Sequence, residues 1–270
     1  MGKCCQHETL KTDVLRAHRL LDVDDVLSRN DVEMVKSQAR GRHVVRLGLS
    51  NGDTCFIKRY PRIGFWQALC VRLLPCGYAS DAMREWKALC RTKSLGISVI
   101  TPLVVGEDRR WGLVRRAFLI TLDGDRDSTL EEVALNSSHD LRRTASHVAS
   151  MLTRLHDGGV NHRDFYIGHL LMRRGDQSGE TIRLMDFNRA DVRSNVGRRW
   201  RVKDLAALHF SLPSRRMGSF GRLRFLLQYT DRDSQTARAL APLVQQRVDR
   251  MTRHVNNMLS RGESNVHINS

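Results

Sequence analysis

The chain has 270 residues, of which 45 are lysine or arginine and 29 are acidic, so its formal net charge is +16. Apolar residues make up 41% and charged residues 27% of the chain, which excludes a disordered or fibrous protein and is typical of a globular fold with a substantial core. The basic excess predicts a polyanionic partner, which could be nucleic acid, anionic lipid or a phosphorylated substrate.

The first 40 residues are polar and weakly periodic, and we expect them to form an N-terminal extension with a short helix or two. Their start lacks the apolar core of a signal peptide, and no charge-free apolar run long enough to span a bilayer follows, so we expect a cytoplasmic protein. The six cysteines show neither a C-x-x-C pair nor a partnering histidine spacing. They predict reduced thiols, with neither a zinc site nor a disulfide scaffold.

Residues 41–122 predict a β-rich lobe. Two β-branched runs, 44–49 and 54–60, flank an Asn51-Gly52 turn signal and predict a hairpin. Three further strands are expected in "VITPLVVGE", "RWGLVRR" and "AFLITL", which makes a sheet of about five. The apolar segment 63–75 predicts a helix that either packs on this sheet or lies in a membrane interface.

A second helix is expected after Ser80 or Asp81, either of which can cap it. Ala82, Glu85 and Leu89 follow at the 3- and 4-residue spacing that places them on one helical face. A glutamate therefore interrupts an otherwise apolar stripe.

Residues 123–136 predict a connector, and residues 137–260 a mostly helical lobe. A Ser137-x-x-Asp140 capping pattern opens a helix that Gly158 and Gly159 should end. A strand-turn-strand and three helices, over 203–210, 220–229 and 236–259, follow, and the tail 261–270 should be disordered. The predicted fold class is α+β, with a β-rich lobe before a helical one.

Four charged residues stand where local structure gives them no evident role in folding: Lys58 in a strand, Glu85 on a buried helix face, Asp164 after a helix and Asp186 after a strand. Each is costly to bury without a partner. Phosphoryl transfer from ATP needs an ammonium for the phosphates, a carboxylate to aim it, a carboxylate for the metal ion and one to accept the hydroxyl proton. The chain supplies these four charges in the order found in kinases.

Short motifs carry a resemblance to known proteins. "FIK" at 56–58, "HRD" at 162–164 and "MDF" at 185–187 resemble the bilobal protein-kinase-like fold. Two positions depart from it, because His169 stands where asparagine is usual and Asn188 replaces the glycine of Asp-Phe-Gly. No G-x-G-x-x-G is present, which leaves Gly41 or the 51–52 turn to cover the phosphates.

Longer strings narrow the resemblance. "NHRDFYIGHLL", "IRLMDFNRADVR" and "RWRVKDLAAL" resemble the lipopolysaccharide kinase (Kdo/WaaP) family, over about residues 58–212. The resemblance implies an ATP-dependent kinase that phosphorylates a sugar hydroxyl of the lipopolysaccharide inner core. Heptose is the first choice of acceptor and Kdo the second.

The resemblance also implies roles for individual residues. Asp164 corresponds to the general base, Lys58 holds the donor phosphates, Glu85 orients Lys58, and Asp186 ligates Mg²⁺. His169 takes the place of the second metal-binding residue. Neutral imidazole is a poor ligand for a hard cation, so His169 could instead hydrogen-bond phosphate or Asp164.

The remaining candidate site residues flank this set. His162 and Arg163, within the catalytic triplet, are expected to orient the loop more than to touch substrate. Leu122, which ends the β-rich lobe, and Asp123, which begins the connector, are the candidate residues beside the expected adenine site. The basic strip Arg193, Arg198, Arg199 and Arg201 either grips an acidic glycolipid or forms a solvated face. Asp204 is expected to anchor its helix to the loop that carries the 162–164 triplet, here called the catalytic loop.

Two other functions stay open. A Ser/Thr/Tyr protein kinase would share every catalytic residue named above. A non-catalytic pseudokinase or basic adaptor is the other, although all four key charges are present and no nucleic-acid-binding module is recognised, so we expect no nucleic acid partner. The lipopolysaccharide reading adds an acidic glycolipid substrate and peripheral contact with the anionic cytoplasmic face of the inner membrane.

Overall fold

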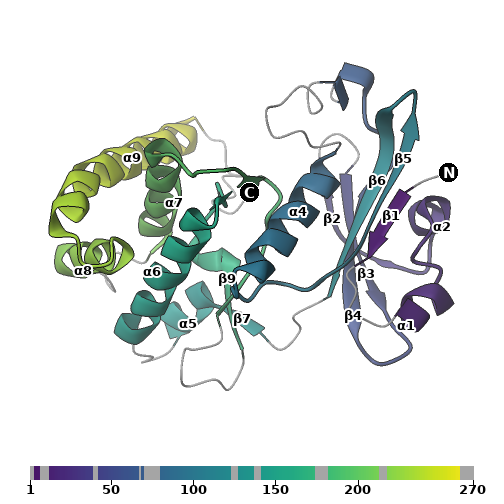
Figure 1. Ribbon diagram of the computed structural model, residues 1–270, viewed down its shortest axis with the longest axis horizontal. Helices are drawn as coiled ribbons and strands as arrows, with labels where there is room; N and C mark the ends of the chain where they lie inside the picture. The colour runs from purple at the N-terminus through teal and green to yellow at the C-terminus, as the bar shows by residue number, and fades with distance from the viewer. Residues whose placement is uncertain are drawn as a thin grey trace. The chain divides into compact units, whose positions relative to one another are not determined.

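The computed structural model describes residues 3–6, 12–38, 42–66, 68–69, 80–122, 127–136, 141–173, 182–212 and 218–261. Its internal contacts divide the chain into two units. The first, here called the sheet unit, comprises 1–90 and 100–125, and the second, the helical unit, comprises 91–99 and 126–270. Antiparallel strands dominate the first and helices the second, which confirms the α+β prediction (Figure 1).

The sheet unit is built on a six-stranded sheet in the order β1-β5-β6-β4-β3-β2. Its strands are β1 (Lys3–Gln6), β2 (Glu33–Gln38), β3 (Arg42–Gly48), β4 (Thr54–Tyr60), β5 (Pro102–Arg110) and β6 (Leu113–Leu122). All neighbours pair antiparallel. The predicted hairpin is confirmed, with Val45 opposite Ile57 and Gly52 in the turn at a φ of 81°.

The expectation of three strands over 99–122 was wrong, because two longer strands, β5 and β6, occupy this stretch. Arg110 pairs with Leu113 across Trp111 and Gly112, whose φ angles are 52° and 75°. A two-residue turn with both φ values positive matches the right-handed twist of the flanking strands. "RWGLVRR" therefore contains the turn, and the arginines after it do not interrupt β6.

The first 40 residues differ from the expected extension, because they belong to the sheet unit. They supply the two edge strands β1 and β2 and the helices α1 (Thr12–Ala17) and α2 (Val23–Ser28). Asp22 caps α2 by accepting hydrogen bonds from the backbone N–H groups of Asp24 and Asp25. Leu15, Leu20, Val23 and Val26 are buried in one core with strand residues that include Ile57, Phe118 and Ile120.

The opposite face of β4 carries Lys58. Successive residues of a strand point to opposite faces, so Ile57 enters the core while Lys58 faces helix α4 (Asp81–Ser94). Ser80 caps this helix by accepting a hydrogen bond from the N–H of Met83 at 3.1 Å. The stripe of Ala82, Glu85 and Leu89 is fully buried, as the spacing predicted.

The helical unit contains two small sheets, in the orders β10-β9-β7 and β11-β8. Its helices and strands are α5 (Leu130–Asn136), α6 (Leu141–Asp157), the 3-10 helix η2 (Ile167–His169), α7 (Arg198–Ser211), α8 (Ser219–Tyr229), α9 (Ser234–Ser260), β7 (Asp127–Thr129), β8 (Val160–Asn161), β9 (Leu170–Arg173), β10 (Ile182–Leu184) and β11 (Asp191–Val192). The predicted helices are confirmed, but α7 begins at Arg198, ahead of the expected 203. The basic strip thus lies partly on a helix.

Gly159 lies between α6 and β8, just before the catalytic loop. Its φ is 83°, and a Cβ at this position would lie 2.1 Å from the carbonyl oxygen of Arg193. Only glycine can therefore occupy it. The Arg193 N–H donates to the Gly159 carbonyl at 2.8 Å, which joins β8 to the segment after β11.

Several predictions lie on residues outside the described ranges. They concern Gly41, most of segment 63–75, Asp123, the Ser137–Asp140 capping pattern and the tail after 261. Within the described ranges, no helix is both long enough and apolar enough to cross a bilayer.

Candidate active site

The sheet unit carries a buried ion pair. Nζ of Lys58 on β4 donates to Oε1 of Glu85 on α4 at 2.5 Å. Glu85 is 0% exposed, and its second oxygen, Oε2, has no hydrogen-bond partner among the described residues. The rigid strand and helix thus hold an ammonium group in one place, as a group that binds phosphate requires.

The helical unit carries Asp164 in the loop after β8. Its carboxylate is buried, and Oδ1 accepts a hydrogen bond from Nη1 of Arg189 at 3.1 Å. Burial raises the pKa of Asp164 above its ordinary value, against the opposing charge of Arg189, and Asp186 adds a further rise. A carboxylate with a raised proton affinity, beside an arginine whose side chain is 46% exposed, is suited to accept a proton from a hydroxyl.

His169 links the catalytic loop to Asp186. Its Nδ1 lies 2.8 Å from the carbonyl oxygen of Asp164, which can only accept, so Nδ1 carries the hydrogen. Nε2 lies 3.7 Å from Oδ2 of Asp186. In the neutral ring, therefore, a lone pair and a carboxylate oxygen face one another, and a cation or a proton can bridge them.

Positive backbone φ angles occur both in the loop of Asp164 and in the segment of Asp186. Arg163 and Asp186 have φ angles of 72° and 58°, values that residues with a Cβ seldom adopt. Such conformations persist only where the surroundings impose them, and they gather at functional sites. Each strained residue is next to, or is, one of the two candidate aspartates.

His162 holds the loop against the Asp186 segment. Its Nε2 donates to the carbonyl oxygen of Met185 at 3.1 Å, and its ring packs on Phe187 with 4.7 Å between centroids. Burial lowers the pKa of His162, so the ring is neutral at pH 7. These contacts suit the orienting role expected of His162, which stays a prediction.

Asp204 of α7 anchors the catalytic loop through its carboxylate. Its carboxylate accepts four hydrogen bonds, from the backbone N–H groups of His162 and Arg163 at 2.9 and 2.7 Å, from Asn161 at 2.8 Å and from His156 at 3.1 Å. Burial alone would raise the pKa of Asp204, but the hydrogen bond and charge of His156 lower it below the ordinary value. The carboxylate therefore stays ionised.

Leu122, proposed for the nucleotide site, ends β6. It pairs with Cys55 on β4, packs partly against the core of the sheet unit, and donates its N–H to the carbonyl of Thr101 at 2.8 Å. Asp123, which was proposed for the same site, lies outside the described residues.

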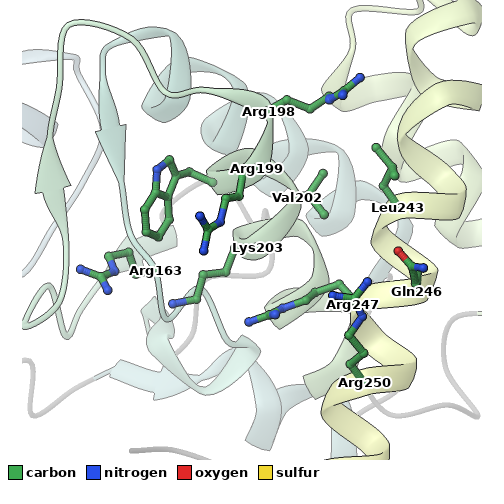
Figure 2. Close-up of a pocket in the computed structure, with 10 residues that line it drawn as sticks. Arg163, Arg198, Arg199, Val202, Lys203, Leu243, Gln246, Arg247 and Arg250 are labelled. Carbon is green, nitrogen blue, oxygen red and sulfur yellow. The ribbon is translucent and has the colours of Figure 1, made fainter.

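The basic strip divides into two pairs. Arg201 donates to Asp157 at 2.8 Å, and Arg193 to Asp191 at 3.0 Å. Arg198 and Arg199 instead line a pocket of about 800 Å³ along α7 and α9 (Figure 2). The other lining residues are Arg163, Trp200, Val202, Lys203, Leu243, Gln246, Arg247 and Arg250.

The sequence reasoning missed three cationic residues. Arg189 pairs with Asp164, and Arg247 and Arg250 form part of the pocket wall. The last two stand three residues apart on α9, so they share one helical face, and that spacing was the available signal.

Comparison with known proteins sets this geometry in a family. Residues 29–239 match the family described as the lipopolysaccharide kinase (Kdo/WaaP) family. The chain belongs to this family. The match includes Lys58, Glu85, Asp164 and Asp186.

Curated members of the Kdo/WaaP family are similar over parts of the chain. The lipopolysaccharide core heptose(I) kinase WaaP of Escherichia coli K12 is 35% identical over 139 residues, 48% of this chain and 52% of that protein. The protein of the same name from Pseudomonas aeruginosa is 31% identical over 205 residues, 72% of this chain and 76% of its own. The chain thus matches about half of the E. coli relative and three quarters of the other.

A solved member of the Kdo/WaaP family shares the fold. The structure described as WaaP in complex with acyl carrier protein aligns with a TM-score of 0.72 and 24% sequence identity. The alignment covers 92% of this chain and 98% of that one. The protein-kinase-like architecture expected from the motifs is therefore confirmed.

Proposed function

We propose that this protein is an ATP-dependent kinase that phosphorylates a sugar hydroxyl of the lipopolysaccharide inner core, with heptose as the acceptor sugar. The observation that carries the proposal is Asp164, a buried carboxylate with a raised pKa in a loop held by Asp204. The heptose assignment draws on the names of the curated relatives.

In the proposed reaction, Asp164 takes the proton of the acceptor hydroxyl while the hydroxyl oxygen attacks the γ-phosphorus of ATP. The new O–P bond forms as the bond from the γ-phosphorus to the bridging oxygen breaks, and ADP leaves. Lys58 binds the donor phosphates, and Glu85 fixes the direction of its ammonium group. Arg189 neutralises Asp164 until the acceptor arrives.

The residues around Asp186 fit a magnesium ion that is held mainly by its nucleotide. Among the described residues, no group of three or more His, Cys, Asp or Glu side chains could hold a metal by itself. Mg²⁺ characteristically takes one or two carboxylates and completes its shell with phosphate and water. Asp186 would supply the carboxylate and His169 a neighbouring nitrogen, and the bound ion would neutralise the β and γ phosphates.

A direct test uses γ-labelled ATP with two acceptors, a core oligosaccharide that lacks the heptose phosphate and a general protein kinase substrate. We expect the label on the oligosaccharide, with mass spectrometry placing it on heptose. Lys58→Met should lose most transfer, whereas Lys36→Met, which alters an exposed lysine of β2, should keep it. Label on protein alone would instead support the protein-kinase alternative.

The glycolipid acceptor would bring the protein to the cytoplasmic face of the inner membrane, as a peripheral enzyme. The neighbouring side chains of Phe65 and Trp66 are 50% and 74% exposed, which suits contact with a lipid interface. Phe65→Ser with Trp66→Ser should reduce co-sedimentation with anionic vesicles. Trp111→Ser, at an exposed turn, is the matched control, and equal binding by both variants would contradict membrane contact through this pair.

A further inference from the structure

The pocket along α7 and α9 is strongly cationic. Six of its ten lining residues are lysine or arginine, and none is acidic. Lys203 and Arg247 project to the side on which Arg163 lies, whereas Arg198 projects the opposite way (Figure 2). Its volume, about 800 Å³, lies in the upper part of the range of about 300–1,000 Å³ seen for small-molecule sites.

Trp200 stands among these cations. The charged groups of Arg163, Arg193, Arg199 and Lys203 lie 5.2, 4.8, 5.5 and 5.9 Å from its ring centroid. The ring face attracts each cation, but the cations repel one another. Asp191 offsets the charge of Arg163 and Arg193. An anionic ligand would relieve the remaining repulsion.

Four other cations of the pocket wall lack a direct ion-pair partner of this kind within the described ranges. Among the described residues, no carboxylate forms an ion pair with Arg199, Lys203, Arg247 or Arg250. Nε of Arg247 is buried and lacks a hydrogen-bond partner within the same ranges. A buried guanidinium nitrogen without a partner is costly, and a bound anion would satisfy it.

The pocket adjoins the proposed base. Arg163 precedes Asp164 in the chain, and the charge of Lys203 acts on Asp164. Arg247 acts on Tyr166, two residues beyond Asp164. A ligand in the pocket would therefore present a neighbouring group to the catalytic loop.

We propose that Arg247 and Arg250 of α9, with Arg199 and Lys203 of α7, bind an anionic substituent of the acceptor glycan and so determine its specificity. The inference rests on the proposed kinase function and extends it, because α9 beyond residue 239 lies outside the family match. Guanidinium groups bind phosphate and carboxylate in a bidentate manner. The reaction that adds this acidic group must then precede phosphorylation.

The test is calorimetric binding of core oligosaccharide without ATP, which does not depend on chemistry. Three ligands are compared: the intact acidic oligosaccharide, its dephosphorylated form and its carboxyl-reduced form. The pocket variant is Arg247→Gln with Arg250→Gln. The control is Arg238→Gln with Arg253→Gln, which removes the same charge from exposed positions of the same helix outside the pocket.

We expect the pocket variant to bind the intact oligosaccharide at least about tenfold more weakly than the parent, since hydrogen bonds to charged groups contribute about that factor or more. The control should bind like the parent. Loss of affinity in the dephosphorylated or the carboxyl-reduced ligand identifies which anion is bound.

Three results would overturn the inference: no binding by the parent, equal weakening in both double variants, or equal affinity for the intact and both neutralised ligands. Phosphate transfer is measured separately. A parent that binds the oligosaccharide through these arginines yet transfers no phosphate would refute the proposed kinase and leave the anion subsite standing.

Discussion

Asp164 and Asp204 are both buried aspartates of the helical unit, but their surroundings differ. Asp204 accepts four hydrogen bonds, two of them from the backbone of the catalytic loop. Among the described residues, the carboxylate of Asp164 accepts one, from the side chain of Arg189, which is 46% exposed. Their pKa values accordingly move in opposite directions, down for Asp204 and up for Asp164.

The comparison shows that, within the helical unit, one buried aspartate is suited to stabilise the fold and the other to take part in proton transfer. A carboxylate saturated with donors is held ionised and fixes the backbone around it. One buried with few donors costs stability in its ionised form, and that cost raises its affinity for a proton. The hydrogen bonds of Asp204 thus position the loop, and their scarcity at Asp164 leaves a base for the reaction.

The largest expected effect is on catalysis at Asp164. Asp164→Ala removes the proposed proton acceptor, so phosphate transfer to core oligosaccharide should fall about a thousandfold, the scale of general-base contributions. ATP binding, measured by calorimetry, should stay close to that of the parent. Transfer well above a thousandth of the parent rate would contradict the role of base.

Asp204→Asn should act mainly on stability. The substitution removes the charge that four donors recognise, so we expect the free energy of unfolding in urea at pH 7 to fall by about 2–3 kcal/mol. Because the folded pKa of Asp204 is lowered, its stabilising contribution is present above the ordinary value of 3.8 and is lost as the pH falls. The difference between variant and parent should therefore shrink in acid. A constant difference would argue against a charge effect.

Arg189→Gln should sharpen the comparison through the pH profile. Without the guanidinium, the largest opposition to the effect of burial is lost, and the pKa of Asp164 should rise further. The acid limb of the transfer rate, which climbs as Asp164 loses its proton, should then move to higher pH. Because Arg189 is partly exposed, we expect a modest loss at the optimum, less than about fivefold. A limb that moves to lower pH would contradict this assignment.

The smallest effect is expected at Arg201, which the sequence placed with the substrate-binding arginines. Its guanidinium is held by Asp157, so Arg201→Gln should lower the free energy of unfolding by less than about 1 kcal/mol. Affinity for core oligosaccharide should be unchanged. If Arg201→Gln weakened the binding of core oligosaccharide as much as the Arg247/Arg250 double variant does, Arg201 would belong to the acceptor-binding site.

The catalytic candidates could be predicted from local motifs, because their chemistry depends on residues that lie close together in the chain. His169 lies five residues after Asp164, at the end of a 3-10 helix, and Asp186 lies two residues after β10. Lys58 and Glu85 lie 27 residues apart in the sequence, but a glutamate within an apolar helical stripe indicated that a buried partner was needed. These expectations needed no knowledge of tertiary contacts.

The sequence could not show which arginines form ion pairs and which line a pocket. Arg201 and Arg199 look alike in "GRRWRVKD", yet the first meets Asp157, 44 residues earlier, and the second faces a pocket completed by α9. The two strands β5 and β6 were divided wrongly because arginines in a half-buried strand resemble a break. The first error concerns contacts distant in the chain, which no local pattern encodes, whereas the second concerns a two-residue turn between neighbouring strands.

The most direct test of the central claim is the free energy of unfolding of Asp164→Asn at pH 7, measured in urea beside the parent and Asp204→Asn. A raised folded pKa means that ionised Asp164 costs stability above that pKa, and asparagine removes the charge. We predict that Asp164→Asn is more stable than the parent while Asp204→Asn is less stable. If both substitutions lower the free energy of unfolding, Asp164 is an anchor like Asp204, and the division of roles between the two aspartates is wrong.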